Sequence, residues 1–191
     1  MMRELMVKNR TIRRFDRSKA VTGEDIREIL SLARLCASAA NLQRIRYISL
    51  VGESAADAFS SITLGGYLPP ESRPDRSVAP TAYIVILAPG ENPDVNLSID
   101  VGIAAEAITL VAAERGIGAC MIRNFKARSF MPSDNSAGLN PVLVLALGYP
   151  AEVAETIDIQ PTDSIKYYKN SDGVNCVPKR MLEELLIEEK C

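Results

Sequence analysis

The chain has 191 residues, a length typical of one domain. Its hydrophobic fraction of 47% and charged fraction of 24% are ordinary for a globular protein. A formal net charge of −2 argues against a nucleic-acid-binding domain, which would normally be strongly basic. The absence of histidine excludes serine–histidine and cysteine–histidine nucleophile pairs and histidine-ligated metal sites. An enzyme of this composition would use carboxylates and lysines, or take its chemistry from a cofactor.

The cysteines and the apolar runs bear on the cellular compartment. Cys36, Cys120, Cys176 and Cys191 are widely separated and form no CxxC pair, so reduced thiols are expected rather than a metal site or disulfides. No apolar run is expected to approach the length of a membrane span, and residues 1–10 lack a secretory apolar core. We therefore expect a soluble cytoplasmic protein without nucleic-acid or membrane partners.

In the first half of the chain, the spacing of apolar residues predicts a helix from residue 2 to about Asn9 and another from 22 to 36. Thr22, followed three residues later by Asp25, has the pattern of a helix N-cap. A strand is expected at 46–51 and a weak helix at 53–61. The proline-rich stretch 68–77 predicts an exposed loop without regular structure.

In the second half, the run TAYIVILA at 81–88 predicts a buried strand. Pro93 and Asp94 open a long helix that reaches Arg115, and Gly116 ends it. Two more buried strands are expected at 118–122 and 141–147. A polar stretch at 160–173 precedes a final helix, which starts at Pro178 and has helical spacing over 181–187. No repeat or second domain is indicated.

The long helix predicts an oligomer. Between Val101 and Ala113 its only strongly polar residues are Glu106 and Thr109. A helix that is apolar on nearly every side must be covered all round, and one sheet covers only part of it. A second subunit would bury the rest of the helix surface, and burial of the helix within one monomer is the alternative.

Three segments carry candidate chemistry. Residues 10–15 (RTIRRF) offer guanidiniums and a hydroxyl suited to a phosphate, or else form a solvated basic surface. Residues 36–43 (CASAANLQ) combine small residues with two amides that could bond the edge of a heterocycle, or else form a plain helix cap and loop. Lys179 and Arg180 could reach an anion or face solvent. No P-loop or dinucleotide fingerprint is present.

Together these segments resemble the FMN-dependent nitroreductase family over essentially the whole chain. The similar elements are Arg10-Thr11-Ile12-Arg13 (Arg-Ser-x-Arg in the family), ASAANLQ at 37–43 (Pro-Ser-x-x-Asn-x-Gln), residues 100–105 with Gly116-Ile117-Gly118 (central helix and turn), and ALGYP at 146–150 (Leu-Gly-x-Pro). A narrower subgroup is indicated by Gly66-Tyr67-Leu68, the strand from Pro80 to Leu87, and Val177-Pro178-Lys179-Arg180.

The resemblance implies an α+β fold with three layers, in which a central, mainly antiparallel sheet is flanked by helices. It also implies a single domain over 1–191 and an intertwined homodimer with two FMN sites at the subunit interface. Arg10, Thr11 and Lys179 or Arg180 would hold the FMN phosphate, and Arg13 would lie near flavin N1 and the C2 carbonyl. The remaining implied contacts are Ala37, Ser38, Ala39 and Asn41 from the other subunit, Ile122, Arg123 and Asn124 beside the ring, and Arg73 at the flavin edge.

The sequence departs from the family pattern at several positions. Ala37 stands where proline is usual, Arg123-Asn124 where glycine with a small residue is common, and Asn9 where a further arginine is common. Most departures would line the substrate side of the flavin and leave the substrate open.

The implied function is transfer of electrons from NAD(P)H through bound FMN to an organic acceptor, such as a nitroaromatic or a quinone, by a ping-pong mechanism. The chemistry resides on the flavin, so no catalytic side chain or metal is expected, and Arg13 would tune the flavin potential. A flavin sensor or store without turnover is the main alternative. Another flavin reaction on the same fold and a cofactor-free interaction module also stay open.

Overall fold

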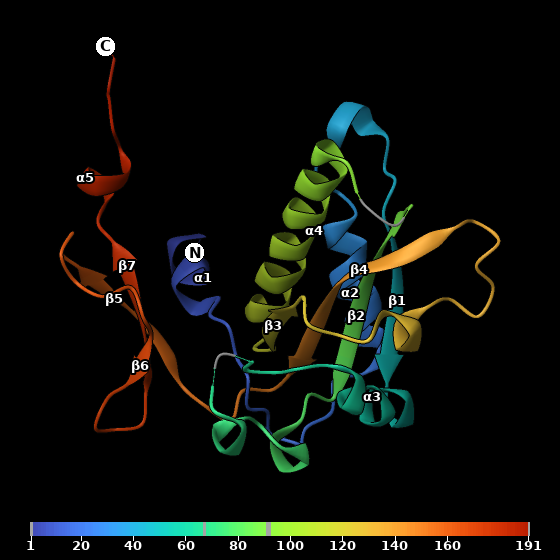
Figure 1. Cartoon of the computed structure of the whole chain (residues 1–191), viewed down its shortest axis with the longest axis horizontal. Coiled ribbons are helices and arrows are strands. Elements are labelled where there is room, and N and C mark those ends of the chain that lie inside the picture. The colour runs from blue at the N-terminus through green and yellow to red at the C-terminus, as the bar shows by residue number, and fades with distance from the viewer. Residues whose placement is uncertain (1, 67, 91–92, 191) are drawn as a thin grey trace.

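The protein, described here from a computed structural model that covers residues 2–66, 68–90 and 93–190, is built on a four-stranded antiparallel sheet (Figure 1). Its strands are β1 (Arg46–Val51), β2 (Ala82–Pro89), β4 (Leu139–Gly148) and β3 (Gly118–Ile122), in that spatial order. All three pairings are antiparallel. The strands predicted at 46–51, 81–88, 118–122 and 141–147 are confirmed, within two residues at each end.

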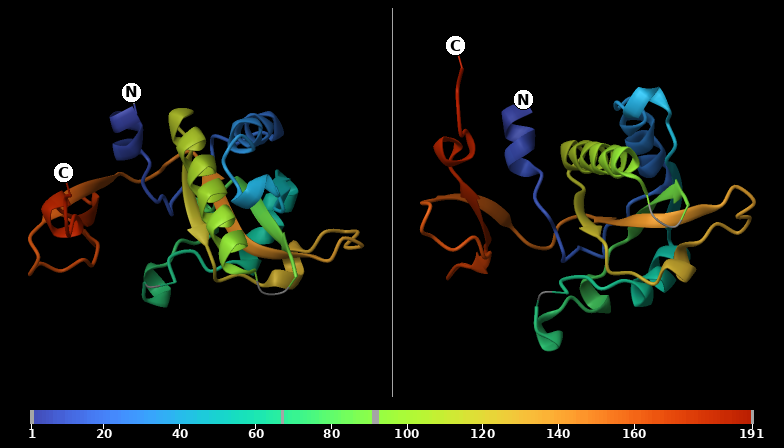
Figure 2. Two further views of the ribbon diagram at one scale, coloured as in Figure 1. Left: turned by 90° about the horizontal axis from the view of Figure 1, so that it is seen from above. Right: turned by 45° about the horizontal axis from the view of Figure 1, so that its top comes forward.

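Helices and loops cover both faces of this sheet. On one face, α2 (Gly23–Ala33) and α4 (Val95–Glu114) bury Ile29 and Ile108 against Ile84 and Leu145. On the other face, the N-terminal segment and α3 (Glu53–Ala58) pack against alternate residues of the same strands. Figure 2 shows the resulting layers. Because both faces are covered, β2 is apolar at every position, which explains the unbroken run TAYIVILA.

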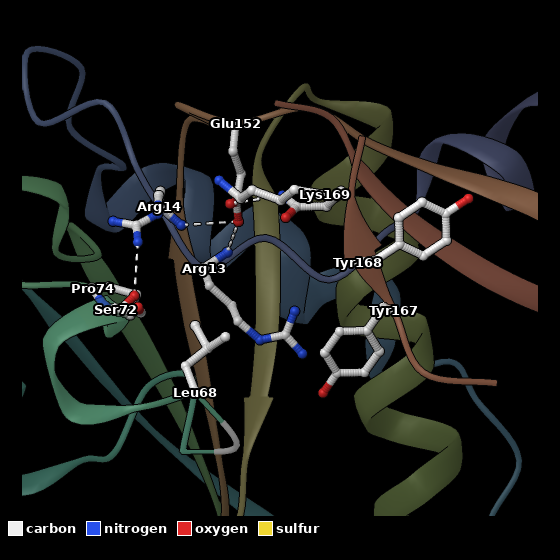
Figure 3. A pocket seen from close by; sticks show the side chains of 10 residues that line it. Arg13, Arg14, Leu68, Ser72, Pro74, Glu152, Tyr167, Tyr168 and Lys169 are labelled. Carbon is white, nitrogen blue, oxygen red and sulfur yellow. Dashed lines mark hydrogen bonds between the residues drawn. The ribbon is translucent and has the colours of Figure 1, made fainter. Parts of the chain in front are cut away.

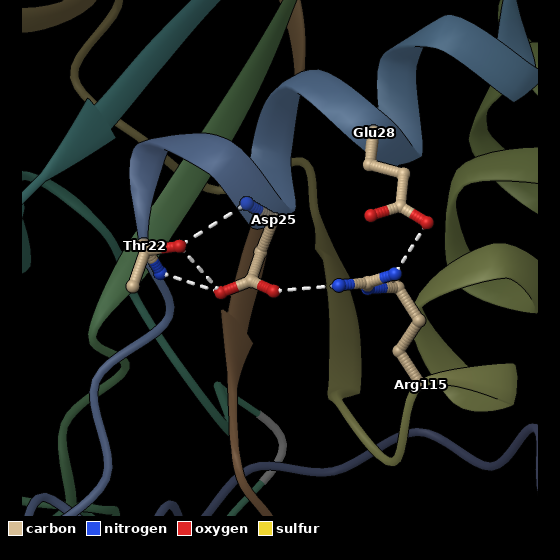
Figure 4. Close-up of polar contacts among 4 residues, drawn as sticks. All are labelled: Thr22, Asp25, Glu28 and Arg115. Atoms are coloured by element: carbon tan, nitrogen blue, oxygen red, sulfur yellow. Dashed lines mark hydrogen bonds and ion pairs between the residues drawn. The ribbon is translucent and has the colours of Figure 1, made fainter.

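The N-terminus of α2 carries the predicted cap (Figure 4). The Thr22 hydroxyl accepts from the Asp25 amide at 3.1 Å, and the Asp25 carboxylate accepts from the Thr22 amide at 2.9 Å. Arg115, at the end of α4, donates to Asp25 at 2.9 Å and to Glu28 at 2.5 Å. Hydrogen bonds from Thr22 and then from Arg115 lower the pKa of Asp25. The cap therefore also ties α2 to the end of α4.

The segment 9–16 crosses the ends of β3 and β4 after α1 (Met2–Lys8), and two glycines let it lie close to them. The Ile12 amide donates to the Ala119 carbonyl at 2.9 Å. A Cβ added at Gly118 would lie 2.7 Å from Ile12 Cγ1, and one at Gly148 would lie 2.7 Å from Phe15 Cδ1. Ile12 and Phe15 are buried, so Arg13 and Arg14 between them are held at the edge of the core.

The C-terminal part forms a second, small sheet beside α1 and away from the main sheet (Figures 1 and 2). Its order is β5 (Ala154–Ile159), β7 (Asn175–Arg180) and β6 (Tyr168–Lys169), with β5 and β7 parallel. The prediction of a helix starting at Pro178 was wrong. Pro178 lies in the part of β7 that β6 does not pair with. Its lack of an amide hydrogen therefore removes no hydrogen bond between β6 and β7. Between β7 and residue 190 a single helical turn, α5 (Leu182–Leu185), follows.

Two further predictions need correction. The proline-rich stretch is not without regular structure, because single 3₁₀ turns form at Pro70–Ser72 and Arg76–Val78. By length and composition α4 could cross a membrane, so the expectation that no apolar run approaches that length was wrong. Its inner face packs on the sheet, while Val95 and Ile99 are 76% and 54% exposed. The described part of one chain therefore does not cover α4 all round.

Candidate functional site

A cavity of about 410 Å³ opens between the segment 9–13, α4, β3 and β7. We call it the cation cavity, because Arg10, Arg13 and Lys179 line it and, among the described residues, Glu106 is its only acidic lining residue. Thr11 also lines it. The structure thus brings residues from opposite ends of the chain to one place, because Thr11 and Val177 both line the cavity.

The polar groups of the cation cavity leave an excess of positive charge. Asn9 Nδ2 donates to Glu106 Oε1 and to Thr109 Oγ1, both at 3.0 Å, so this amide binds one oxygen of the Glu106 carboxylate. The Arg10 guanidinium donates to the Met6 carbonyl at 2.5 Å. Its Nε is buried and has no hydrogen-bond partner within residues 2–66, 68–90 and 93–190. A buried donor without a partner is costly, so the Arg10 guanidinium keeps unused donor capacity beside the cavity that it lines.

Lys179 and Arg180 turn to opposite sides because β7 is a strand. Successive side chains of a strand alternate between its faces, so Val177 and Lys179 line the cation cavity together. Arg180 instead forms an ion pair with Glu184 and donates to the Pro161 carbonyl at 3.4 Å. The structure therefore does not bring Arg180 to this cavity.

Arg13 stands where the cation cavity meets two neighbouring cavities. Its guanidinium lies 5.4 Å from the ring centre of Tyr167 (Figure 3). Its backbone amide donates to Glu152 Oε1 at 2.5 Å, and the Arg14 amide donates to the same oxygen at 3.2 Å. Glu152 Oε2 accepts from Asn175 Nδ2 at 2.9 Å. One carboxylate therefore fixes the backbone at Arg13 and ties it to the C-terminal sheet.

The predicted strip at 122–124 lies next to Arg13. Ile122, Arg123 and Asn124 line a shallow cavity of about 170 Å³ with Cys120 and Gly66. Burial raises the pKa of the Cys120 thiol to about 11, so this thiol stays protonated at neutral pH.

Arg73 does not line that shallow cavity. It donates to the Leu68 carbonyl at 3.0 Å and to the Gly66 carbonyl at 3.3 Å, and so braces the loop beside it. Tyr67, part of the subgroup resemblance, lies outside the described residues.

The segment 37–41 does not reach the cation cavity within one chain. Ala37 and Ser38 line a separate cavity of about 150 Å³ with Asp100. The Ala39 amide donates to Asp100 Oδ1 at 2.8 Å, and Ala40 and Asn41 have left-handed φ values of 49° and 53°.

The helix α4 separates the two sites. Asp100 lines the cavity that contains Ser38, and Thr109 lines the cation cavity. The two residues are nine positions apart in α4, which places them about 13 Å apart along the helix axis and on opposite sides of the helix. One small ligand therefore cannot contact both sites of the same chain.

Sequence reasoning missed several residues of the site. Asn9 was singled out only as a departure from the family pattern. Glu106 and Thr109 did stand out as polar residues in an apolar helix, which was the signal that could have placed them at a ligand. Glu152 and Tyr167 gave no such signal, because only the fold brings them to Arg13.

The fold and the site define an α+β protein with a cavity, lined mostly by cationic and polar side chains, between the end of its sheet and a C-terminal extension. Residues 6–149 match the model of the Nitroreductase family. The chain belongs to this family, and membership places it among the family's oxidoreductases. No curated protein sequence matches the chain.

Solved structures of low sequence identity share the fold. A nitroreductase family protein from Streptococcus pneumoniae superposes with a TM-score of 0.67 at 18% identity, with 100% of both chains covered. A candidate nitroreductase from Desulfovibrio desulfuricans, solved in complex with FMN, gives 0.65 at 23% identity, with 98% of this chain and 96% of that chain covered. The FMN-dependent nitroreductase NfnB from Mycobacterium smegmatis, solved in complex with NADPH, gives 0.62 at 17% identity, with 78% and 87% covered.

Proposed function

We propose that this protein is an FMN-dependent oxidoreductase. It takes electrons from NAD(P)H and passes them, in a ping-pong sequence, to an organic acceptor such as a nitroaromatic or a quinone. The observation that carries the proposal is the cation cavity, which Arg10, Arg13 and Lys179 line together and where the buried Arg10 Nε has no partner among the described residues. Two solved structures of the same fold support it, one a candidate nitroreductase in complex with FMN and the other an FMN-dependent nitroreductase in complex with NADPH.

The residues of the cation cavity fit the phosphate of FMN. A phosphate monoester carries close to two negative charges at neutral pH, and forked guanidinium donors match its oxygens. Arg10 and Lys179 supply the charge, Thr11 supplies a hydroxyl, and Asn9 keeps Glu106 from competing for these cations.

The flavin ring would lie along the strip 122–124, with Arg13 at its N1 and C2-carbonyl edge. Bound FMN supplies the chemistry of accepting a hydride and passing electrons on. Arg13 stabilises negative charge at that edge, and its position is fixed from behind by Glu152. Arg73 supports the loop over the ring edge through Gly66 and Leu68.

The second half of the site would come from another copy of the chain. Since α4 separates Ser38 from the cation cavity, Ala37, Ser38, Ala39 and Asn41 can contact the same FMN only from a partner subunit. The exposed apolar row of Val95, Ile99 and Ile103 on α4 supports such a homodimer. We further propose a soluble cytoplasmic enzyme whose only partners are itself and small molecules.

The first experiment is the absorbance spectrum of the purified protein, followed by denaturation and identification of the released flavin. We expect FMN, bound more tightly than riboflavin because the phosphate is recognised. Arg10→Gln and Lys179→Gln should each weaken FMN binding about 10- to 100-fold, the effect of losing one charge-assisted hydrogen bond. Arg17→Gln, an exposed change in the same segment, is the matched control. A colourless protein that does not bind added FMN would contradict the proposal.

A flavin store without turnover is the alternative that one observation favours. Arg123 is exposed beside the strip 122–124 and could cover the ring. Anaerobic stopped-flow mixing with NADH and with NADPH separates the two functions. Bleaching of the flavin absorbance, followed by recovery on addition of a quinone, is expected of the enzyme, and a stable yellow protein is expected of the store.

A further inference from the structure

A second cavity of about 360 Å³ shares Arg13 with the cation cavity, and Figure 3 shows its lining residues. We call it the tyrosine cavity. Arg13 and Arg14 form one wall, Tyr167, Tyr168 and Lys169 another, and Leu68 and Pro74 a third. Of these three walls, the proposed flavin site uses only Arg13 and, in the loop that Arg73 supports, Leu68, so the rest of the tyrosine cavity is left for another ligand.

The charges of the tyrosine cavity favour an anion. Arg13, Arg14 and Lys169 are cationic, and Glu152 is the only carboxylate among the described lining residues. Both Glu152 oxygens already accept hydrogen bonds from N–H groups of Arg13, Arg14 and Asn175, so this carboxylate is already bound to these three residues. The Arg14 guanidinium donates once, to the Ser72 carbonyl at 3.0 Å. Within the described ranges the Lys169 ammonium has no hydrogen-bond or ion-pair partner.

The remaining walls favour a flat ring. The Tyr167 and Tyr168 side chains are 42% and 53% exposed, with the Arg13 guanidinium packed over the Tyr167 ring. Leu68 and Pro74 supply apolar surface from the 68–74 loop. Aromatic faces stack on heterocycles, and guanidiniums both stack on rings and pair with phosphates. A volume of 360 Å³ is small for a ligand pocket and suits part of a dinucleotide rather than a whole one.

We infer that the tyrosine cavity binds the adenosine 2′-phosphate half of NADPH, which makes NADPH the preferred reductant over NADH. This inference rests on the proposed function, because the proposed reaction supplies one ligand that joins an aromatic base to a phosphate dianion. Adenine would stack on the tyrosines, and Arg14 and Lys169 would pair with the 2′-phosphate. Because Arg13 borders both cavities, a reductant held here has its nicotinamide end next to the flavin site.

The test measures nucleotide binding without turnover. Titration calorimetry on the purified protein compares 2′,5′-ADP with 5′-AMP, which lacks the 2′-phosphate. We expect 2′,5′-ADP to bind about 10- to 100-fold more tightly, the factor given by one or two charge-assisted contacts. Lys169→Gln should remove most of that difference and Lys169→Arg should keep it. Lys166→Gln, an exposed change of the same charge three residues away, should leave it unchanged. Tyr167→Leu should weaken both nucleotides equally.

Kinetics give a second readout. With the FMN-loaded protein, Lys169→Gln should raise KM for NADPH and leave kcat and the KM for NADH unchanged. Equal affinities for 2′,5′-ADP and 5′-AMP, or a difference that survives Lys169→Gln, would overturn the inference. Flavin content is recorded for every variant, because a protein that fails to hold FMN overturns the proposed function instead.

Discussion

Replacement of Glu152 by glutamine tests how the site is held in place. Glu152 Oε1 accepts from the amides of Arg13 and Arg14 at 2.5 and 3.2 Å, and Oε2 accepts from Asn175 Nδ2 at 2.9 Å. Every partner is a donor, so a carboxylate suits the position. Glutamine has the same shape and leaves packing unchanged, but it has one oxygen and an NH₂ group in place of two acceptors.

The magnitude follows from these contacts. Loss of the charge weakens the two backbone hydrogen bonds by about 1 kcal/mol each, the difference between charged and neutral acceptors. The new NH₂ group would then face the Asn175 amide. Rotation of Asn175 would resolve this conflict, but it would turn an oxygen toward the Val153 carbonyl, to which Nδ2 now donates at 3.3 Å. Either arrangement costs about 1 kcal/mol more, which brings the total to about 2–3 kcal/mol.

The assay is thermal unfolding of Glu152→Gln against wild type at pH 7. For a chain of this size about 2–4 °C is lost per kcal/mol, so the melting temperature should fall by about 5–10 °C. FMN affinity should fall as well, since Arg13 loses its support. Glu71→Gln, at an exposed carboxylate of the neighbouring loop, should change neither. An unchanged melting temperature for Glu152→Gln would refute this reasoning.

Three further outcomes are expected. Gly148→Ala places a Cβ 2.7 Å from the buried Phe15 ring and should lower the unfolding free energy by about 1–3 kcal/mol in urea titrations, whereas Gly23→Ala, with its nearest neighbour 4.0 Å away, should be neutral. The lowered pKa of Asp25 contributes stability that is present above its unfolded pKa and is lost as the pH falls through its folded pKa. Between about pH 5 and pH 2 the unfolding free energy of Asp25→Asn should therefore fall less than that of wild type. An equal fall in both proteins would contradict the assignment to Asp25. The pKa of the Cys120 thiol is about 11, so in native protein at pH 8 its reaction with a thiol reagent should be no faster than unfolding of the chain.

The sequence predicted the elements whose signals are local. The cap at Thr22 and Asp25, the apolar run of β2 and the glycine after α4 each specify an element within a few residues. The C-terminal sheet could not be predicted this way, because β5 pairs with β7 across a polar stretch that has no strand pattern of its own. Pro178 reinforced the error, since a proline commonly starts a helix and is rarer in a strand.

The residues of the candidate site also fall into two groups, those with a local sequence signal and those that only the fold brings together. Arg10, Thr11 and Arg13 could be predicted from one short segment, and Lys179 from a motif near the other end. The choice between Lys179 and Arg180 depended on whether 175–180 is a strand, and only the fold decides which neighbour faces the cavity. Glu152 is 139 residues from Arg13, and no local pattern links the two.

The position of Arg13 depends on backbone contacts more than on its own side chain. Gly118 and Gly148 admit Ile12 and Phe15 on either side of it, and Glu152 holds its amide. Truncation of the Arg13 side chain should therefore leave the fold intact and remove one charge from the three cavities that it borders. Changes at the glycines or at Glu152 should instead move a correctly charged side chain out of place. We therefore expect truncation of Arg13 to abolish ligand binding at unchanged stability, and changes at the glycines or at Glu152 to reduce both binding and stability. This pair of results would show that main-chain contacts position Arg13.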